Sequence, residues 1–102
     1  MRHASMANGF QVQDDGTSIE VEVTRDSLES ENVYCIIDDA SRSIFIWKGR
    51  RSGVRRKFIG AQTANRMRSE YRTTFKVHSL DEGEEPAVFF SAISNNSGEP
   101  SQ

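Results

Sequence analysis

Two apolar segments separated by a short turn constrain the fold of this chain more than any other feature. The first, at residues 32–38, is almost continuously apolar, and the second, at residues 43–48, is rich in β-branched and aromatic residues. A continuous apolar run of this length is typical of a strand covered on both faces. The polar residues 39–42 favour a turn. The sequence therefore predicts a hairpin at the centre of a sheet, with a packed layer on each side.

Three further segments have the pattern of strands. Residues 9–14 and 19–24 alternate apolar and polar side chains on either side of Asp15-Gly16. This pattern is typical of an antiparallel hairpin with one face in water. Residues 74–80 form the last predicted strand, which brings the expected sheet to five strands.

A long helix is predicted at residues 54–72, and Ser52 is a candidate for its N-cap. At about 100° per residue, most apolar side chains of this segment fall on one face, which we expect to pack on the sheet. The members of that face are Val54, Phe58, Ala61, Ala64, Met67 and Tyr71. Gly60 falls on the packed side, where the missing side chain allows the helix to approach the sheet closely.

The length of 102 residues fits one domain. Pro86 suits the first turn of a short helix at residues 86–93. We expect an α+β fold in which a five-stranded, mostly antiparallel mixed sheet lies between one long and one short helix. The domain is assigned to residues 9–93. Residues 1–8 are assigned to a residual tag sequence or a disordered N-terminus, and residues 94–102 to a disordered tail or linker.

Charge is distributed unevenly along the chain. Residues 40–76 carry eleven Lys and Arg residues against the single acid Glu70, although the net charge is −2. Such a basic centre suggests an acidic partner, and a solvated helix face is the alternative. Nucleic acid is not the expected partner, because the helix aromatics Phe58 and Tyr71 are assigned to the core and are not free to stack on bases.

Sequence signals for catalysis are weak, and we predict a protein that is not an enzyme. The single cysteine, Cys35, has the setting of a small buried hydrophobe. His78 is a lone histidine on a strand, and the Asp38-Asp39 pair suits a turn. A chain with one cysteine and no signal-peptide pattern is expected in the cytoplasm.

The order and spacing of these segments resemble a domain of the gelsolin/villin family. The resemblance rests on NVYCIID at residues 32–38, SIFIWKG at 43–49, the long helix, and DEGEEP at 81–86. SLESEN at residues 27–32 is similar to the family's lead into the second hairpin strand. The resemblance covers residues 9–93 and implies the gelsolin-type fold, a monomer, and a cytoskeleton-associated role.

The resemblance also implies a partner, since gelsolin domains that bind actin place this helix in the cleft between actin subdomains 1 and 3, with an Ile near this position. Ile59 lies off the predicted packed face and is the expected apolar anchor. The residues expected around it at an actin interface are Arg55, Arg56, Thr63, Arg66 and Glu70. The resemblance thus implies a domain that regulates actin monomer availability or filament ends, as in filament capping.

Calcium is the point of departure from the family pattern. The family's own site uses a carbonyl and an acidic side chain at the start of the central strand, a Glu of the long helix, and a carbonyl near the C-terminal end. Here the first position reads Glu31-Asn32, and the helix carries cations at residues 55–57. We therefore expect an absent or weak site within the domain, with Asn32 and Glu31 as its weak candidate ligands, and no required cofactor. A metal shared with actin through Glu70 stays open.

Two alternative functions stay open at this stage. Basic faces of gelsolin-like domains also meet phosphoinositides, and Arg50, Arg51 and Lys57 are the candidate residues for such lipids. Some gelsolin-like domains are architectural modules of larger assemblies, such as vesicle coats. Neither alternative requires binding to actin.

Overall fold

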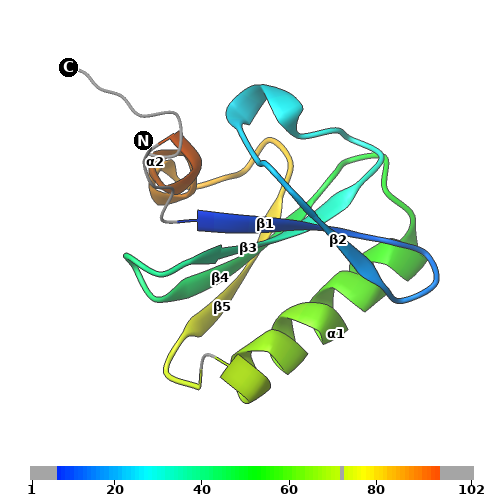
Figure 1. The fold of residues 1–102 in the computed structure, drawn as a ribbon. Helices are drawn as coiled ribbons and strands as arrows, with labels where there is room; N and C mark the ends of the chain where they lie inside the picture. Colours follow the sequence, from blue (N-terminus) through cyan, green and yellow to red (C-terminus); the bar gives the residue numbers. More distant parts are fainter. Residues whose placement is uncertain (1–6, 72, 95–102) are drawn as a thin grey trace.

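The computed structural model describes residues 7–71 and 73–94, which form a five-stranded sheet with a helix on each face (Figure 1). The elements are β1 (Ala7–Val12), β2 (Ser18–Val21), the 3₁₀ helix η1 (Arg25–Ser27), β3 (Val33–Asp38), β4 (Ser43–Lys48), α1 (Val54–Tyr71), β5 (Lys76–Asp81) and α2 (Ala87–Ser94). The predicted order of strands and helices is confirmed. The first strand begins two residues before the predicted domain boundary, and the segments 1–6 and 95–102 lie outside the described residues.

The strands lie in the order β2-β1-β3-β4-β5, with β3 at the centre. Antiparallel pairing joins β1 to β2, β1 to β3, and β3 to β4. The pairing of β4 with β5 is parallel, because the chain crosses from one to the other through α1. The sheet is therefore mixed and mostly antiparallel, as the sequence predicts.

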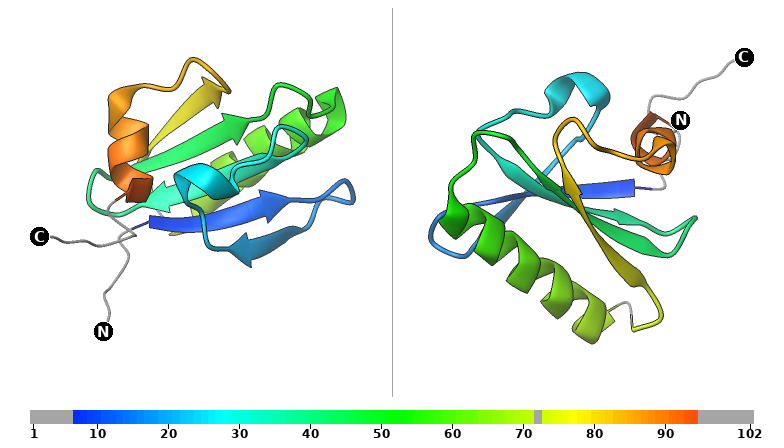
Figure 2. Two further views of the ribbon diagram at one scale, coloured as in Figure 1. Left: turned by 90° about the horizontal axis from the view of Figure 1, so that it is seen from above. Right: turned by 180° about the vertical axis from the view of Figure 1, so that it is seen from behind.

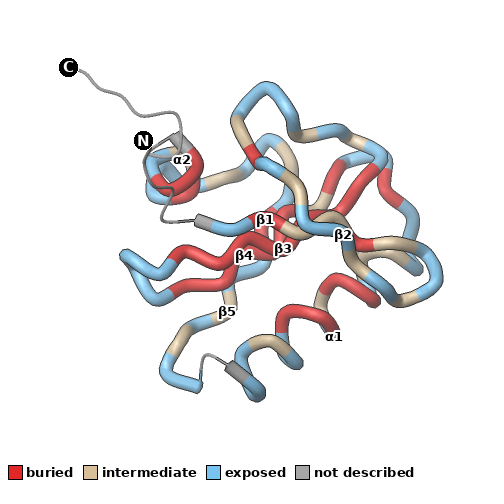
Figure 3. Tube along the Cα trace, in the orientation of Figure 1, coloured by how far each residue is buried: buried red, intermediate tan, exposed pale blue. Residues whose placement is uncertain are grey.

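Alternation along the two central strands divides the core into two layers. Tyr34, Ile36 and Trp47 face the layer that includes Phe89 and Ile93 of α2. Neighbouring positions face the opposite layer, which is closed by α1, and this layer contains Val12, Val33, Cys35, Ile37, Ile44, Ile46, Ile59 and Ala64. Nearly all of β3 and β4 is buried (Figure 3), and the two helices lie on opposite sides of the sheet (Figure 2). The continuous apolar pattern of these strands thus reflects burial on both faces.

The face of α1 that packs on the sheet is only partly the predicted one, although Gly60 and Ala64 lie on it as expected. Ile59, Thr63 and Ala64 are buried, whereas Val54 and Phe58 are 83% and 62% exposed. The predicted exposure of Ile59 and Thr63 and the predicted burial of Val54 and Phe58 are therefore wrong. Ala61 and Met67 are half-buried at the edge of the α1 layer, and the side chain of Tyr71 lies outside the described part of the chain.

Close approach to the sheet explains which face is buried. A Cβ atom added at Gly60 would lie 2.6 Å from Cγ1 of Val33 and 3.5 Å from Cγ2 of Ile46. The sheet supplies the bulk at this contact, so small residues of the helix fit against it. The prediction was wrong at Val54 and Phe58 because these two bulky apolar residues lie on the outer face, while Ile59 lies on the inner one.

The turn after β4 also depends on a glycine. Gly49 packs directly on the backbone of the segment before β3, and its amide donates to the carbonyl of Asn32 at 3.0 Å. Ser52 donates its hydroxyl to the carbonyl of Gly49 at 2.7 Å, and α1 begins only at Val54. Ser52 therefore closes this loop and is not the N-cap that the sequence suggested.

Within the described residues, no helix is both long enough and apolar enough to cross a membrane.

Candidate binding surface on the long helix

The outer face of α1 presents exposed apolar side chains on adjacent turns. Val54 and Phe58 are four residues apart, so their side chains lie on the same side of the helix. Among the described residues, the other exposed large hydrophobic side chains are Ile19 of β2 and Val88 of α2. Single exposed apolar residues are common, but two at positions i and i+4 are neighbours on one face of the helix.

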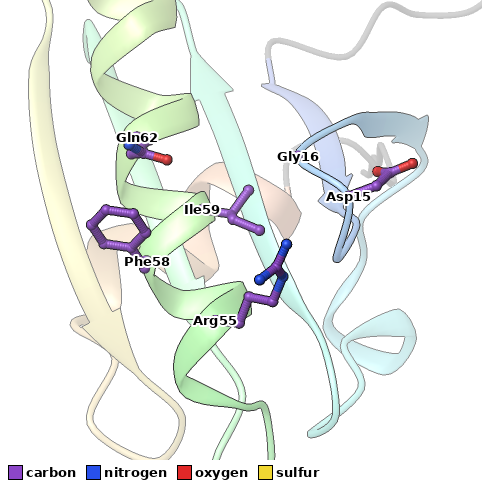
Figure 4. A pocket seen from close by; sticks show the side chains of 6 residues that line it. All are labelled: Asp15, Gly16, Arg55, Phe58, Ile59 and Gln62. Carbon is purple, nitrogen blue, oxygen red and sulfur yellow. The ribbon is translucent and has the colours of Figure 1, made fainter.

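A groove runs beside this surface, between α1 and the turn that joins β1 to β2 (Figure 4). Its volume is ≈ 250 Å³, and its lining consists of Asp15, Gly16, Arg55, Phe58, Ile59 and Gln62. Arg55 and Ile59 project from the helix toward the turn. Ile59 thus contributes to the groove wall while the rest of its side chain packs in the core.

Hydrogen bonds hold the turn that forms the other wall. The amide and hydroxyl of Thr17 both donate to the Asp15 carboxylate, at 3.0 and 2.6 Å, and together they lower the pKa of that carboxyl, the hydroxyl most. Gly16 has a φ of 93°, which glycine adopts without strain. Arg55 Nε donates to the carbonyl of Asp14 at 2.8 Å and links the turn to α1. Both walls of the groove are therefore fixed by the fold.

The structure separates the residues that the sequence grouped around Ile59. Arg55, Arg66 and Glu70 are exposed on α1, while Thr63 is only 1% exposed and lies against the sheet. Arg56 turns inward, where its guanidinium donates to Asp14, Glu31 and Asn32. The cationic rim of the outer face is accordingly smaller than predicted.

The candidate calcium ligands are engaged by other groups. Asn32 is buried, its side-chain oxygen accepts from Arg56 at 2.6 Å, and its side-chain nitrogen donates to Glu29 at 3.0 Å. The Glu31 carboxylate lies 3.6 Å from Arg51. In the described part of the chain, no three His, Cys, Asp or Glu side chains group together, and the Arg56 guanidinium occupies the oxygens at the start of β3. The residues present therefore do not fit a calcium ion within the domain.

The three residues predicted to bind phosphoinositides do not act as one cluster, because each has its own local surroundings. The backbone amide of Arg50 donates to the Glu82 carboxylate at 2.7 Å, and Arg51 is paired with Glu31. Lys57 lies half-buried on α1. Acidic side chains thus offset part of the positive charge in this region.

Three other residues with reactive side chains make contacts within the fold. Burial raises the pKa of the Cys35 thiol to about 12, and its sulfur donates to the carbonyl of Gly60 at 3.4 Å. Asp38 accepts from the hydroxyl of Ser41 at 2.7 Å in the turn after β3. His78 stacks on Phe45 with 5.5 Å between ring centroids. Cys35 therefore lacks the thiolate character of a nucleophile, and Asp38 stabilises a turn.

Comparison with known proteins agrees with this architecture. A family model of the gelsolin repeat matches residues 17–90. The chain belongs to the gelsolin-repeat family. A search of curated proteins found no match to it.

Solved structures of gelsolin-like proteins have the same fold. Thorarchaeota ProGel, solved in complex with rabbit actin, matches with a TM-score of 0.81 and 24% sequence identity, over 86% of this chain and 99% of ProGel. Thorarchaeota 2DGel3, also solved with rabbit actin, matches with a TM-score of 0.72 and 26% identity, over 90% of this chain and 49% of 2DGel3. The human COPII-coat protein Sec24c gives 0.65 and 8% identity over 86% of this chain and 15% of its own. This gelsolin-repeat fold is therefore present in actin complexes and in a coat protein.

Proposed function

We propose that this gelsolin-repeat domain binds actin through the outer face of α1. Val54 and Phe58 are the apolar anchors, and Arg55, Gln62 and Arg66 surround them. The observation that carries the proposal is the pair of large apolar side chains, 83% and 62% exposed, on adjacent turns of one helix. The complexes of ProGel and 2DGel3 with rabbit actin support actin as the partner.

The physical form of the surface suits a helix bound in an apolar groove. Anchors at positions i and i+4 are typical of that mode of recognition. A partly exposed aromatic side chain gains most when it is removed from water in a partner's pocket, while polar neighbours exclude solvent around it. The 18 residues of α1 give a helix of about 27 Å, at about 1.5 Å per residue, which is long enough to extend across such a groove.

The exposed arginines add electrostatic steering. Arg55 and Arg66 lie on the exposed side of α1, and cations at the rim of an interface accelerate encounter with an acidic partner more than they strengthen the final complex. We therefore expect binding to weaken as salt is raised, mainly through slower association.

A domain of this size that occupies one site on actin would act on monomers or on filament ends. The proposed activity is regulation of monomer availability or end capping, and the protein would then associate with the cytoskeleton. No calcium ion is part of this proposal, because the residues at the family's site do not fit one.

Assembly of pyrene-labelled actin tests the proposal. The wild-type domain is expected to lower the rate or the final extent of assembly in proportion to its concentration, and Phe58→Asp is expected to remove most of this effect. No effect of the wild-type domain on assembly, together with binding to vesicles that contain phosphoinositides, would contradict the proposal and favour the lipid alternative. No effect on actin and no binding to lipid would favour an architectural module.

A further inference from the structure

Arg56 joins three segments of the chain at one point. Its Nε donates to the Asp14 carboxylate at 2.8 Å, and its Nη1 donates to the side-chain oxygen of Asn32 at 2.6 Å and to the carbonyl of Glu31 at 3.3 Å. Asp14 belongs to the turn between β1 and β2, and Glu31 and Asn32 lead into the central strand. The first turn of α1 is thereby tied to both.

The groups around Arg56 have the composition of a cation site. A carboxylate, an amide oxygen and a backbone carbonyl all direct oxygen atoms at one positive charge, and oxygen ligands of this kind are those that Ca²⁺ takes in proteins. The guanidinium fills the space between them, and its side chain is 25% exposed. A metal site here would also need a carboxylate from the helix. The helix instead supplies the positively charged side chain of Arg56.

Arg56 also lies at the place where the gelsolin resemblance puts a metal ion. That resemblance assigns calcium ligands to a carbonyl and a side chain at the start of the central strand and to a residue of the long helix. Arg56 is a residue of the long helix, and it contacts the carbonyl of Glu31 and the side chain of Asn32. The Arg56 guanidinium and a metal ion would therefore compete for the same oxygen atoms of Glu31 and Asn32.

We propose that the Arg56 guanidinium is a built-in cation that replaces a divalent metal ion between α1 and the start of β3. The domain therefore holds α1 in place without Ca²⁺. The guanidinium is planar and charged, so its hydrogen bonds are strong and fix the orientation of α1 relative to the start of β3. The inference concerns folding, so its failure would be distinguishable from failure to bind actin.

Thermal unfolding of the full chain tests this proposal, measured in EGTA and in millimolar CaCl₂. The variants are Arg56→Gln, which removes the charge, and Arg56→Glu, which places a carboxylate beside the oxygens of Asp14, Glu31 and Asn32. Arg66→Gln is the matched control, because it removes the same charge from an exposed position of the same helix.

Three results are expected. The wild-type Tm is the same in both buffers, and Arg56→Gln lowers the Tm by about 5 °C or more relative to Arg66→Gln, which corresponds to about 1 kcal/mol for a domain of this size. Arg56→Glu unfolds earlier still in EGTA, and CaCl₂ raises its Tm because the ion binds only the folded state.

Opposite results would overturn the proposal. A wild-type Tm that rises by several degrees with CaCl₂ would show that the folded domain binds the ion with Arg56 in place. Equal Tm values for Arg56→Gln and Arg66→Gln would show that the Arg56 guanidinium does not stabilise the position of α1. A folded Arg56→Glu variant without a response to CaCl₂ would show that these oxygens are not a cation site. If Arg56→Glu does not fold, the comparison of the two Gln variants decides.

Discussion

Gly60 of α1 lies directly against Val33 of the central strand, and a Cβ atom at Gly60 would stand 2.6 Å from Cγ1 of Val33. This contact sets how closely the helix approaches the sheet and how the helix is rotated about its axis. Ile59 and Thr63 are turned inward as a consequence, and Phe58 is turned outward. The surface that α1 exposes therefore depends on a glycine that is itself buried.

Gly60→Ala is expected to destabilise the domain although alanine favours a helix. The gain in helix propensity is about 1 kcal/mol, but inserting a methyl group into a packed contact costs about 1–3 kcal/mol. We expect a net loss of up to about 2 kcal/mol, measured by urea unfolding. Ser69→Ala, at an exposed position of the same helix, should be neutral or slightly stabilising. A Gly60→Ala domain more stable than wild type would contradict the contact.

Neighbouring residues 58 and 59 are expected to respond differently to the same substitution. Ile59→Asp would bury a carboxylate among the residues of the α1 layer, so it should lower the free energy of unfolding by at least about 2 kcal/mol. Phe58→Asp replaces a side chain that is 62% exposed and should change stability by less than about 1 kcal/mol. Equal losses in urea titrations of the two variants would argue against the described rotation of the helix.

Trp47 is expected to be a major contributor to the α2 layer. It is 2% exposed, its ring centroid lies 5.7 Å from that of Tyr34, and its Nε1 donates to the Glu85 carboxylate at 2.7 Å. Trp47→Ala should cost about 3–5 kcal/mol. Trp47→Phe keeps an aromatic ring but loses the hydrogen bond, so its cost should be smaller. Near-wild-type thermal stability of Trp47→Ala would refute this role.

Lowering the pH should weaken the hydrogen bonds that Glu82, in the loop after β5, accepts from Arg50 in the β4–α1 loop and from Ser30. The Arg50 amide and, to a smaller extent, the Ser30 hydroxyl hold the pKa of the Glu82 carboxyl below its usual 4.5. The folded state therefore favours the charged form, and this contribution is complete above pH 4.5 and lost as the pH falls through the lower folded-state pKa.

Glu82→Gln is the variant that tests this pH dependence. It should be less stable than wild type at pH 7, and the difference should shrink as the pH falls below 4.5. Urea unfolding at a series of pH values measures this difference. If the difference in unfolding free energy between Glu82→Gln and wild type stays constant down to pH 3, titration of Glu82 does not cause the pH dependence.

The sheet was predictable from the sequence because its patterns are strong and local. The continuous apolar run of β3 and its return in β4 allow few arrangements other than a central pair covered on both faces. The parallel position of β5 follows from the length of α1 between it and β4. Gly49, the last residue of the segment SIFIWKG, lies where only a glycine fits against the backbone of Ser30 and Asn32.

The exposed face of α1 was not predictable from hydrophobicity alone. The helix carries apolar residues on two sides, and the bulkier aromatic one, Phe58, is outside. The small residues Gly60, Thr63 and Ala64, spaced by three and four, were the available signal for the packed side, because a helix that lies close to a β-branched sheet surface needs small side chains there. The inward turn of Arg56 depends on Asp14 and Asn32, which are distant in sequence, so helical spacing could not reveal it.

The affinity of the domain for monomeric actin, measured by calorimetric titration, tests whether the outer face of α1 is the actin-binding surface. The comparison is between Phe58→Asp and Val88→Asp, because both side chains are 62% exposed but lie on helices that cover opposite faces of the sheet. Phe58→Asp should raise Kd by at least about 30-fold, or about 2 kcal/mol, because it places a carboxylate where an apolar anchor is desolvated. Val88→Asp should leave Kd within about twofold of wild type. Equal Kd values for wild type, Phe58→Asp and Val88→Asp would contradict the assignment of the outer face of α1 as the actin-binding surface.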